Sequence, residues 1–391
     1  MSSQPHDPTA AESGDDAVLS VEHLTKVYGD GTLAVDDISF TVERGDFCVV
    51  IGPSGCGKST TLHSIVGKIA PTSGRIVLDG TDITDLPTYR RDISLVFQDF
   101  QLFPHMSVEE NVYYGLEAAD IERAAADVDD LLSLLGIAEY SESSPRALSA
   151  GQKQRVALAR SLVIEPKLLL LDEPLGDMDY KLQKRMEREL LRIHRETDTT
   201  FVYVTHDQTQ AMRLADQIIV MNGGRIEQSD SVEAVYNRPS TAFVSTFVGD
   251  SNVFSGAVTA VLEGGDVVRV ATPWGAFDIG TENLRAPPVD VRGTVIPFAV
   301  RPHRLSVSDT ATNTLSCAVD DVIHRPDAGT QIVGHATDYR GVDKEVQLTS
   351  WEQIDVEGDT VIVGWEPEDA VLLEELSVLP GIDLERDILG E

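Results

Sequence analysis

The sequence predicts an α/β domain that contains a helical insertion, followed by an all-β domain. A glycine-rich stretch at 52–60 lies between an apolar, β-branched run and the start of a helix, as in α/β folds. Helical and strand patterns alternate to about residue 247, and short runs separated by turn signals replace them afterwards. We therefore expect the α/β domain at 17–247, its insertion at about 99–147, and the β domain at 248–391.

The glycine-rich stretch has the pattern G-x-x-x-x-G-K-[ST], which binds phosphate when it stands between a strand and a helix. The glycines let backbone N–H groups face anionic oxygens, and the helix N-terminus adds partial positive charge. Lys58 is expected to reach the β- and γ-phosphates of a nucleotide, and the Ser59 hydroxyl to bind Mg²⁺. The expected phosphate-binding residues are Gly52, Pro53, Ser54, Gly55, Cys56, Gly57, Lys58, Ser59 and Thr60.

The other elements of the α/β domain follow from apolar spacing and from start and stop signals. Strands are expected at 18–27, 38–42, 47–51, 75–78, 93–97, 168–171 and 200–205, with a hairpin at 217–227. Helices are expected at 121–135, 150–164, 179–195 and from residue 208. Gly136 and Pro166 end the first two of these helices, and Ser107 with Glu110 predicts a capping box at the start of another.

The second domain is predicted from short apolar runs between turn signals. These runs lie at 253–261, 267–272, 295–300, 330–333 and 361–365. Residues 1–16 are expected to be a disordered acidic tail, since they lack the apolar core of a signal peptide, and no structure is assigned to 373–391.

Charge limits the classes of partner. The 391 residues include 65 acidic and 31 basic side chains, for a net charge of −34. Such a charge repels nucleic acid and anionic membrane surfaces. Because the acids are spread along the chain and lysine is rare, they indicate the solvated surface of a halophile rather than one acidic tail. Three cysteines without a pairing or metal pattern fit a reducing cytosol, and no apolar run is long enough to span a membrane.

Several polar residues follow predicted strands and so could surround a nucleotide. Asp172 can hold Mg²⁺ through water, and Glu173 can orient or deprotonate the water that attacks the γ-phosphate. His206 could contact the γ-phosphate and the base Glu173, although a structural role is about as plausible for a lone histidine. Gln98 suits contact with Mg²⁺ and water. Tyr28 could stack on a purine or could equally be an ordinary core or surface tyrosine.

A second anion site is indicated by Ser149-Ala150-Gly151 before a predicted helix. One nucleotide does not need two helix N-termini from distant parts of one domain. This site could therefore serve a nucleotide bound by another copy of the chain, or Ser149 could be an ordinary helix cap.

Taken together, these residues resemble the nucleotide-binding subunit of an ABC transporter. The phosphate loop, Gln98, the signature at 148–152, the strand end at Asp172 and Glu173, and His206 occur in the family order. The resemblance implies a P-loop NTPase fold over 17–247. It also implies an ATPase that uses ATP and Mg²⁺, in which Gln98 and His206 assist the base Glu173.

The resemblance further implies a head-to-tail dimer, formed with a second copy or with a paralogous ATPase. Each ATP would lie between the phosphate loop and Tyr28 of one copy and the signature of the other. The implied signature contacts are Ser149, Gly151 and Gln152, and Asp179 would lie in the loop that crosses the interface. Two departures are Ala150, where the family usually has glycine, and 176–179, where it usually has Ser-x-Leu-Asp.

Residues 98–108 and 236–249 resemble the importer group of this family, and the β domain is similar to its OB-like (TOBE) domains. Arg301-Pro302-His303 stands where those domains carry Arg-Pro-Glu. The resemblance implies transmembrane permease subunits, an extracellular solute-binding protein, and a place on the cytoplasmic face of the cell membrane. Polyamine, iron, sugar, thiamine or oxyanion uptake remains open. Phe100, Phe103 and Met106 could line the groove for a permease helix or be core residues.

Two other classes of function are weaker alternatives. A soluble ABC ATPase acting on DNA or ribosomes would usually carry a long coiled coil or a second ATPase domain, and the sequence shows neither. An OB-like domain that binds oligonucleotides would need a basic, aromatic-rich strand face, which the sequence does not indicate.

Overall fold

The computed structural model describes residues 16–374, except 120, 122–124, 177, 198, 283–291, 326–328, 355 and 357. The chain divides into two compact units, Met1–Val232 and Glu233–Glu391. The expected tail at 1–16 lies outside the described residues apart from Asp16, and so does the C-terminal segment after Glu374.

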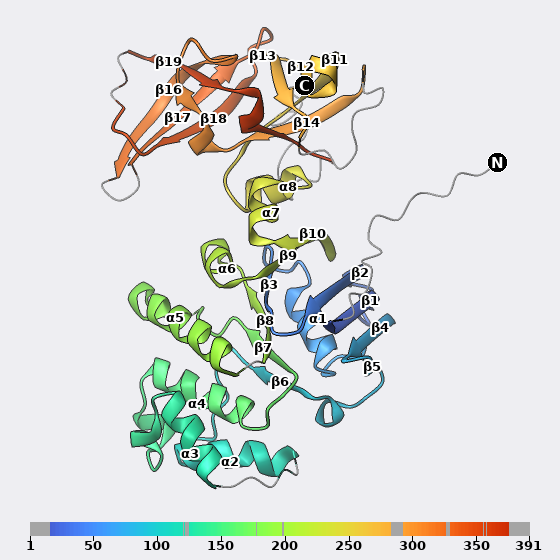
Figure 1. Cartoon of the computed structure of the whole chain (residues 1–391), viewed down its shortest axis with the longest axis vertical. Helices are drawn as coiled ribbons and strands as arrows, with labels where there is room; N and C mark the ends of the chain where they lie inside the picture. The colour runs from blue at the N-terminus through green and yellow to red at the C-terminus, as the bar shows by residue number, and fades with distance from the viewer. Residues whose placement is uncertain are drawn as a thin grey trace, which may run out of the picture. The chain divides into compact units, whose positions relative to one another are not determined.

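The first unit is built on a six-stranded sheet in the order β10–β9–β3–β8–β7–β6 (Figure 1). All neighbouring strands in it are parallel except the β9–β10 hairpin. Its strands are β3 (Phe47–Ile51), β6 (Ile93–Val96), β7 (Leu168–Asp172), β8 (Thr200–Thr205), β9 (Gln217–Asn222) and β10 (Arg225–Ser231). β3 and β8 are buried along their whole length, which explains their continuous apolar sequences. Because β3, β6, β7 and β8 are parallel, the segments that follow them all leave from one edge of the sheet.

An antiparallel sheet in the order β2–β1–β4–β5 completes the strands of this unit. Its members are β1 (Ala17–Val27), β2 (Leu33–Glu43), β4 (Ser73–Leu78) and β5 (Thr81–Asp82). One hydrophobic core contains buried residues of both sheets. The expected strand at 38–42 was too short, because β2 keeps pairing with β1 as far as Leu33 opposite Val27.

The helices of the first unit are α1 (Lys58–Ile65), α2 (Val108–Ala119), α3 (Ala125–Leu134), α4 (Ala150–Leu162), α5 (Tyr180–Thr197) and α6 (Gln208–Leu214). Figure 1 shows α2, α3 and α4 gathered at one end of this unit. The capping box before α2 has the expected contacts, since Ser107 N donates to Glu110 and Glu110 N donates to Ser107. The helix expected at 121–135 is described only from Ala125, and Ile121 lies outside it. Gly136 follows α3 with a φ of 63°, as a helix-ending glycine should.

Short 3₁₀ turns connect several elements. They are η1 (Thr88–Arg90), η2 (Ala138–Tyr140), η3 (Pro145–Ala147), η4 (Glu263–Gly265), η5 (Pro302–Arg304) and η6 (Pro367–Asp369). Within the described part of the chain, no helix has both the length and the apolar character that crossing a bilayer requires.

The second unit begins earlier than the expected boundary at 247/248, because two helices belong to it. α7 (Val232–Asn237) stands at the junction, and α8 (Ala242–Phe247) packs against two strands of the following domain, β11 and β14. Arg301 holds this arrangement, since its guanidinium donates to the carbonyls of Ser245 and Tyr236. The Arg301-Pro302 stretch therefore has a structural role, because Arg301 joins β14 to the segment that contains α7 and α8.

Two antiparallel five-stranded sheets form the rest of the second unit, in the orders β13–β12–β11–β14–β20 and β15–β19–β16–β17–β18. The first contains β11 (Asn252–Leu262), β12 (Val267–Thr272), β13 (Gly275–Gly280), β14 (Val295–Val300) and β20 (Ala370–Leu372). The second contains β15 (Ser306–Val307), β16 (Asn313–Arg325), β17 (Gly329–Thr337), β18 (Asp343–Ser350) and β19 (Thr360–Trp365). They share one core, in which Phe254, Phe277, Phe298 and Trp365 are packed ring against ring.

Candidate functional site

At two positions of the loop between β3 and α1, the backbone conformation and the close packing together require glycine. Gly52 has a φ of 156°, and a Cβ there would lie 2.2 Å from the carbonyl oxygen of Met221. Gly57 has a φ of 104°, and a Cβ there would lie 2.5 Å from the carbonyl oxygen of Ala34. The loop is therefore fixed between β9 and β2 by close backbone contacts.

The loop and α1 together have the chemistry of an anion site. The N-cap of α1 is Gly57, which has no side chain to cap the helix, so the first-turn N–H groups are left for an anion. Lys58 is 7% exposed, and its ammonium donates to the carbonyls of Gly52 at 2.7 Å and Pro53 at 3.0 Å. A buried cation and an uncapped helix N-terminus at one loop fit the phosphates of a nucleotide.

Two predicted magnesium ligands lie side by side. The Ser59 hydroxyl donates to Asp172 Oδ1 at 3.4 Å, which joins the start of α1 to the end of β7. Burial raises the pKa of Asp172, and the neighbouring charge of Glu173 raises it further. A hydroxyl and a carboxylate are among the few oxygen ligands that Mg²⁺ accepts beside phosphate and water. The donor set therefore fits Mg²⁺.

The sequence did not single out His63, which lies one helical turn after Ser59 on α1. His63 Nε2 is 3.7 Å from Asp172 Oδ2, whereas Ser59 contacts the other carboxylate oxygen, Oδ1. Burial lowers the pKa of His63. The spacing of four residues on a helix is the signal that could have identified it.

The predicted base and its partner are also adjacent. His206 Nδ1 and Glu173 Oε2 are 3.1 Å apart, where β8 and β7 end. Glu173 has a φ of 45°, an uncommon conformation for a side chain this large. Gln98 and Glu173 both border Gly176, since a Cβ on Gly176 would lie 3.7 Å from Gln98 Nε2 and 3.8 Å from Glu173 Oε2.

Tyr28 lies against the phosphate loop. Its hydroxyl is 3.2 Å from Thr60 Oγ1, the residue is 38% exposed, and Lys26 Nζ lies 5.5 Å from the centroid of its ring. The exposed ring does not fit the alternative of a core tyrosine. It leaves an aromatic surface beside the loop on which a purine can stack.

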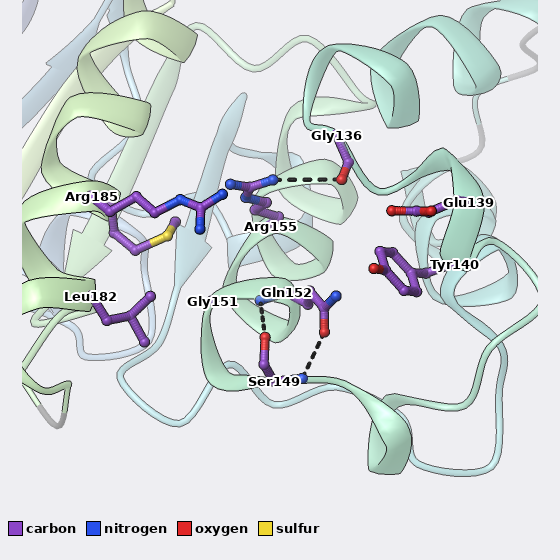
Figure 2. A pocket seen from close by; sticks show the side chains of 10 residues that line it. Gly136, Glu139, Tyr140, Ser149, Gly151, Gln152, Arg155, Leu182 and Arg185 are labelled. Atoms are coloured by element: carbon purple, nitrogen blue, oxygen red, sulfur yellow. Dashed lines mark hydrogen bonds between the residues drawn. The ribbon is translucent and has the colours of Figure 1, made fainter.

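The signature segment forms a complete helix cap and borders a cavity. Ser149 Oγ accepts from Gln152 N at 3.4 Å, and Gln152 Oε1 accepts from Ser149 N at 2.8 Å. A cavity of about 220 Å³ lies beside them, lined by residues of η2, α4 and α5 together with Gly136 and Ser149 (Figure 2). Figure 2 shows Arg155 and Arg185 among its side chains. The cap uses the oxygen of the Gln152 amide and not its nitrogen, and Gln152 is one of the residues that line the cavity.

Asp179 has a structural partner that the sequence did not reveal. Its carboxylate accepts from Leu182 N at 3.1 Å and so caps α5. Of the unusual interface-loop residues, Asp177 lies outside the described residues.

Cys56 offers a chemical probe of the loop. Burial raises the pKa of this thiol although Lys58 opposes the rise, and the residue is only 3% exposed. We expect alkylation to be slow at neutral pH, to accelerate as pH rises, and to slow further when MgATP closes the loop. Maleimide labelling followed by peptide mass spectrometry measures the rate. Cys317, in the second unit, is the control that ATP should not affect, and equal Cys56 rates with and without MgATP would contradict a nucleotide-enclosing loop.

Comparisons with known proteins agree with this geometry. Residues 35–176 match the family described as ABC transporter, and residues 298–373 match the TOBE domain family. The chain is 37% identical over 372 residues to the spermidine/putrescine import ATP-binding protein PotA of Rubrobacter xylanophilus, covering 93% of this chain and 96% of the relative. It is 38% identical to the putrescine transport ATP-binding protein PotG of Escherichia coli, covering 91% and 95%. Among solved structures, cbiO1 from Clostridium perfringens, part of the ABC transporter complex cbiONQ, has a TM-score of 0.52 at 34% identity, covering 56% of this chain and 91% of that one.

These matches confirm the predicted fold class, an ATPase domain with a helical part followed by an OB-like domain. ATP-binding subunits of ABC importers hydrolyse ATP to drive transport, and the same activity follows for this chain. The phosphate loop lies inside the matched ABC transporter region, and the second unit contains the matched TOBE domain. The chain belongs to the ATP-binding subunits of ABC transporters, in the importer group that carries a C-terminal TOBE domain.

Proposed function

We propose that the chain powers polyamine uptake as one of two ATPase subunits attached to a membrane permease. The names of its relatives, which refer to spermidine and putrescine, favour a polyamine over iron, sugar, thiamine or oxyanion. The observation that supports the catalytic part is the Glu173–His206 pair, at the strand edge that also holds the phosphate loop; Gln98 and Glu173 both border Gly176.

The hydrolytic step is assigned to residues at that edge. Lys58 and the first N–H groups of α1 bind the phosphates, and the exposed face of Tyr28 holds the adenine. Glu173 accepts the proton of the attacking water, while His206 keeps its carboxylate oriented. Mg²⁺, held by Ser59, Gln98 and Asp172, would neutralise charge on the phosphates.

The signature segment supports a dimer. Ser149 and Gly151 border a cavity whose described lining includes no residue of the phosphate loop. A second copy arranged head to tail would bring this surface onto the nucleotide of its mate. A paralogous ATPase could take the place of the second copy.

A groove in the helical part suits a permease helix. It has a volume of about 180 Å³ and is lined by Asp99, Phe100, Leu102, Pro104, Pro145, Arg146 and Lys153. Phe100 therefore belongs to the groove, whereas Phe103 packs against Tyr114 with ring centroids 4.5 Å apart. Binding there would hold the chain on the cytoplasmic face of the cell membrane.

Uptake is tested in cells that lack their own polyamine importers and express this chain with its neighbouring permease and solute-binding protein genes. We expect radiolabelled spermidine or putrescine to accumulate, and Lys58→Ala to abolish accumulation. If the chain hydrolyses ATP in these cells but neither polyamine accumulates, the assignment of a polyamine as the transported substrate is wrong. Co-purification with nucleic acid instead of a permease would favour the soluble ABC ATPase alternative.

The charge of −34 leads to a prediction about salt. We expect the thermal midpoint and the ATPase rate to rise as KCl approaches about 1 M, where the Debye length is about 3 Å and self-repulsion is screened. Circular dichroism and phosphate release across a KCl series measure both. Maximal activity in dilute buffer would contradict a halophilic surface.

A further inference from the structure

The chain makes a strained turn directly after β6. Phe100 N donates to the carbonyl of Phe97 at 3.0 Å, which closes a turn with Gln98 inside it. Phe100 and Gln101 then have φ values of 59° and 44°. Two successive non-glycine residues rarely adopt this left-handed conformation, and it persists only where surrounding contacts hold it.

Arg160, in the last turn of α4, makes those contacts. Its Nη2 donates to the Phe100 carbonyl at 3.0 Å and its Nη1 donates to the Gln101 carbonyl at 2.8 Å. The guanidinium also lies 5.5 Å from the centre of the Phe103 ring. A planar fork with a permanent charge can hold two adjacent carbonyls at once, which an ammonium cannot do with the same geometry.

The backbone that carries Arg160 is itself fixed. At Gly115 of α2, a Cβ would lie 2.5 Å from the Arg160 carbonyl oxygen, so α2 and α4 are in close backbone contact. The other end of α4 carries the signature residues Ser149 and Gly151. One helix thus connects the signature to the turn that contains Gln98.

We propose that Arg160 is a positioning residue that couples the signature helix to the Gln98 turn. Its guanidinium fixes the turn that carries Gln98, which borders Gly176 together with Glu173. A nucleotide bound by the signature segment and a permease helix bound in the Phe100 groove would therefore both act on this turn through α4. The inference rests on the proposed function. It assigns Arg160 an effect on turnover and leaves ATP binding to the phosphate loop.

Arg160→Lys tests the coupling because lysine keeps the charge but loses the fork. We expect kcat for ATP hydrolysis to fall about tenfold while KM for ATP stays within about twofold. Hydrogen exchange of the amides at 99–103 should accelerate about tenfold. The matched control is Arg192→Lys, since Arg192 donates to the Leu134 carbonyl at 2.6 Å from α5, and its kcat should stay at the wild-type value.

A second pair of variants changes the turn itself and leaves Arg160 and the rest of α4 unchanged. Gln101→Pro forces φ to about −65° and so breaks the turn, whereas Gln101→Gly adopts the left-handed conformation freely. We expect the proline variant to reproduce the kcat loss at unchanged KM and the glycine variant to stay within about twofold of wild type.

Wild-type kcat in both Arg160→Lys and Gln101→Pro would overturn the inference. A parallel loss of ATP affinity and thermal midpoint in Arg160→Lys would also overturn it, since that indicates general destabilisation. A wild-type chain that does not hydrolyse ATP would instead overturn the proposed function.

Discussion

Glu173→Gln is expected to lower kcat by at least about a hundredfold, because a positioned general base contributes about 10²–10⁴ to the rate. The amide keeps the size of the carboxylate and can still contact His206, which lies 3.1 Å from Glu173. ATP affinity should therefore remain within about threefold. Without hydrolysis, the nucleotide-bound dimer should accumulate, and sedimentation velocity with ATP measures it beside the phosphate-release rate.

Glu165→Gln is the matched control for this substitution. Glu165 also has a positive φ, 49°, but it precedes β7 instead of following it. This variant should hydrolyse ATP at the wild-type rate and show no trapped dimer. Undiminished turnover in Glu173→Gln would remove Glu173 from the role of base.

Gly57→Ala is expected to weaken nucleotide binding about a hundredfold. The substitution places a Cβ 2.5 Å from the Ala34 carbonyl at a φ of 104°, so strain and overlap act together. Together they cost about 3 kcal/mol, which is about a hundredfold in affinity if the binding conformation of the loop bears the cost. Titration with a fluorescent ATP analogue measures the loss.

Gly55→Ala separates backbone strain from overlap. Gly55 has a φ of 81°, but a Cβ there meets nothing within 4 Å. We expect this variant to weaken binding only about tenfold, from strain of about 1 kcal/mol or slightly more. Equal affinities for the two alanine variants would show that the contact with Ala34 does not fix the loop.

The parallel core of the first unit was predictable from local sequence. β8 matches its predicted range 200–205, and β7 adds only Asp172 to the run 168–171, because both are buried on two faces and read as continuous apolar runs. The length of β2 and the place of α8 were not predictable. Both depend on which distant strand or core an element joins, and local apolar spacing does not contain that information.

The site was predictable to the extent that its residues follow strands of one parallel sheet. That rule explains why Ser59 and Asp172, and Glu173 and His206, lie within hydrogen-bond reach. The contacts of Arg160 were missed, because a side chain that binds backbone carbonyls about 60 positions earlier leaves no periodic pattern. The roles of the site residues remain predictions that the variants above test.

The head-to-tail dimer is tested most directly by cross-linking two differently tagged Glu173→Gln chains, one with Ser54→Cys and the other with Ser149→Cys. Both positions are exposed, and the native thiols Cys48, Cys56 and Cys317 are buried, so a short bis-maleimide should report the introduced pair. A cross-link between the two tags that forms with MgATP and not with ADP is the predicted result. A cross-link that forms equally with MgATP and with ADP would contradict two copies closing over shared ATP. The absence of any cross-link between the two differently tagged chains in the presence of MgATP would contradict it as well.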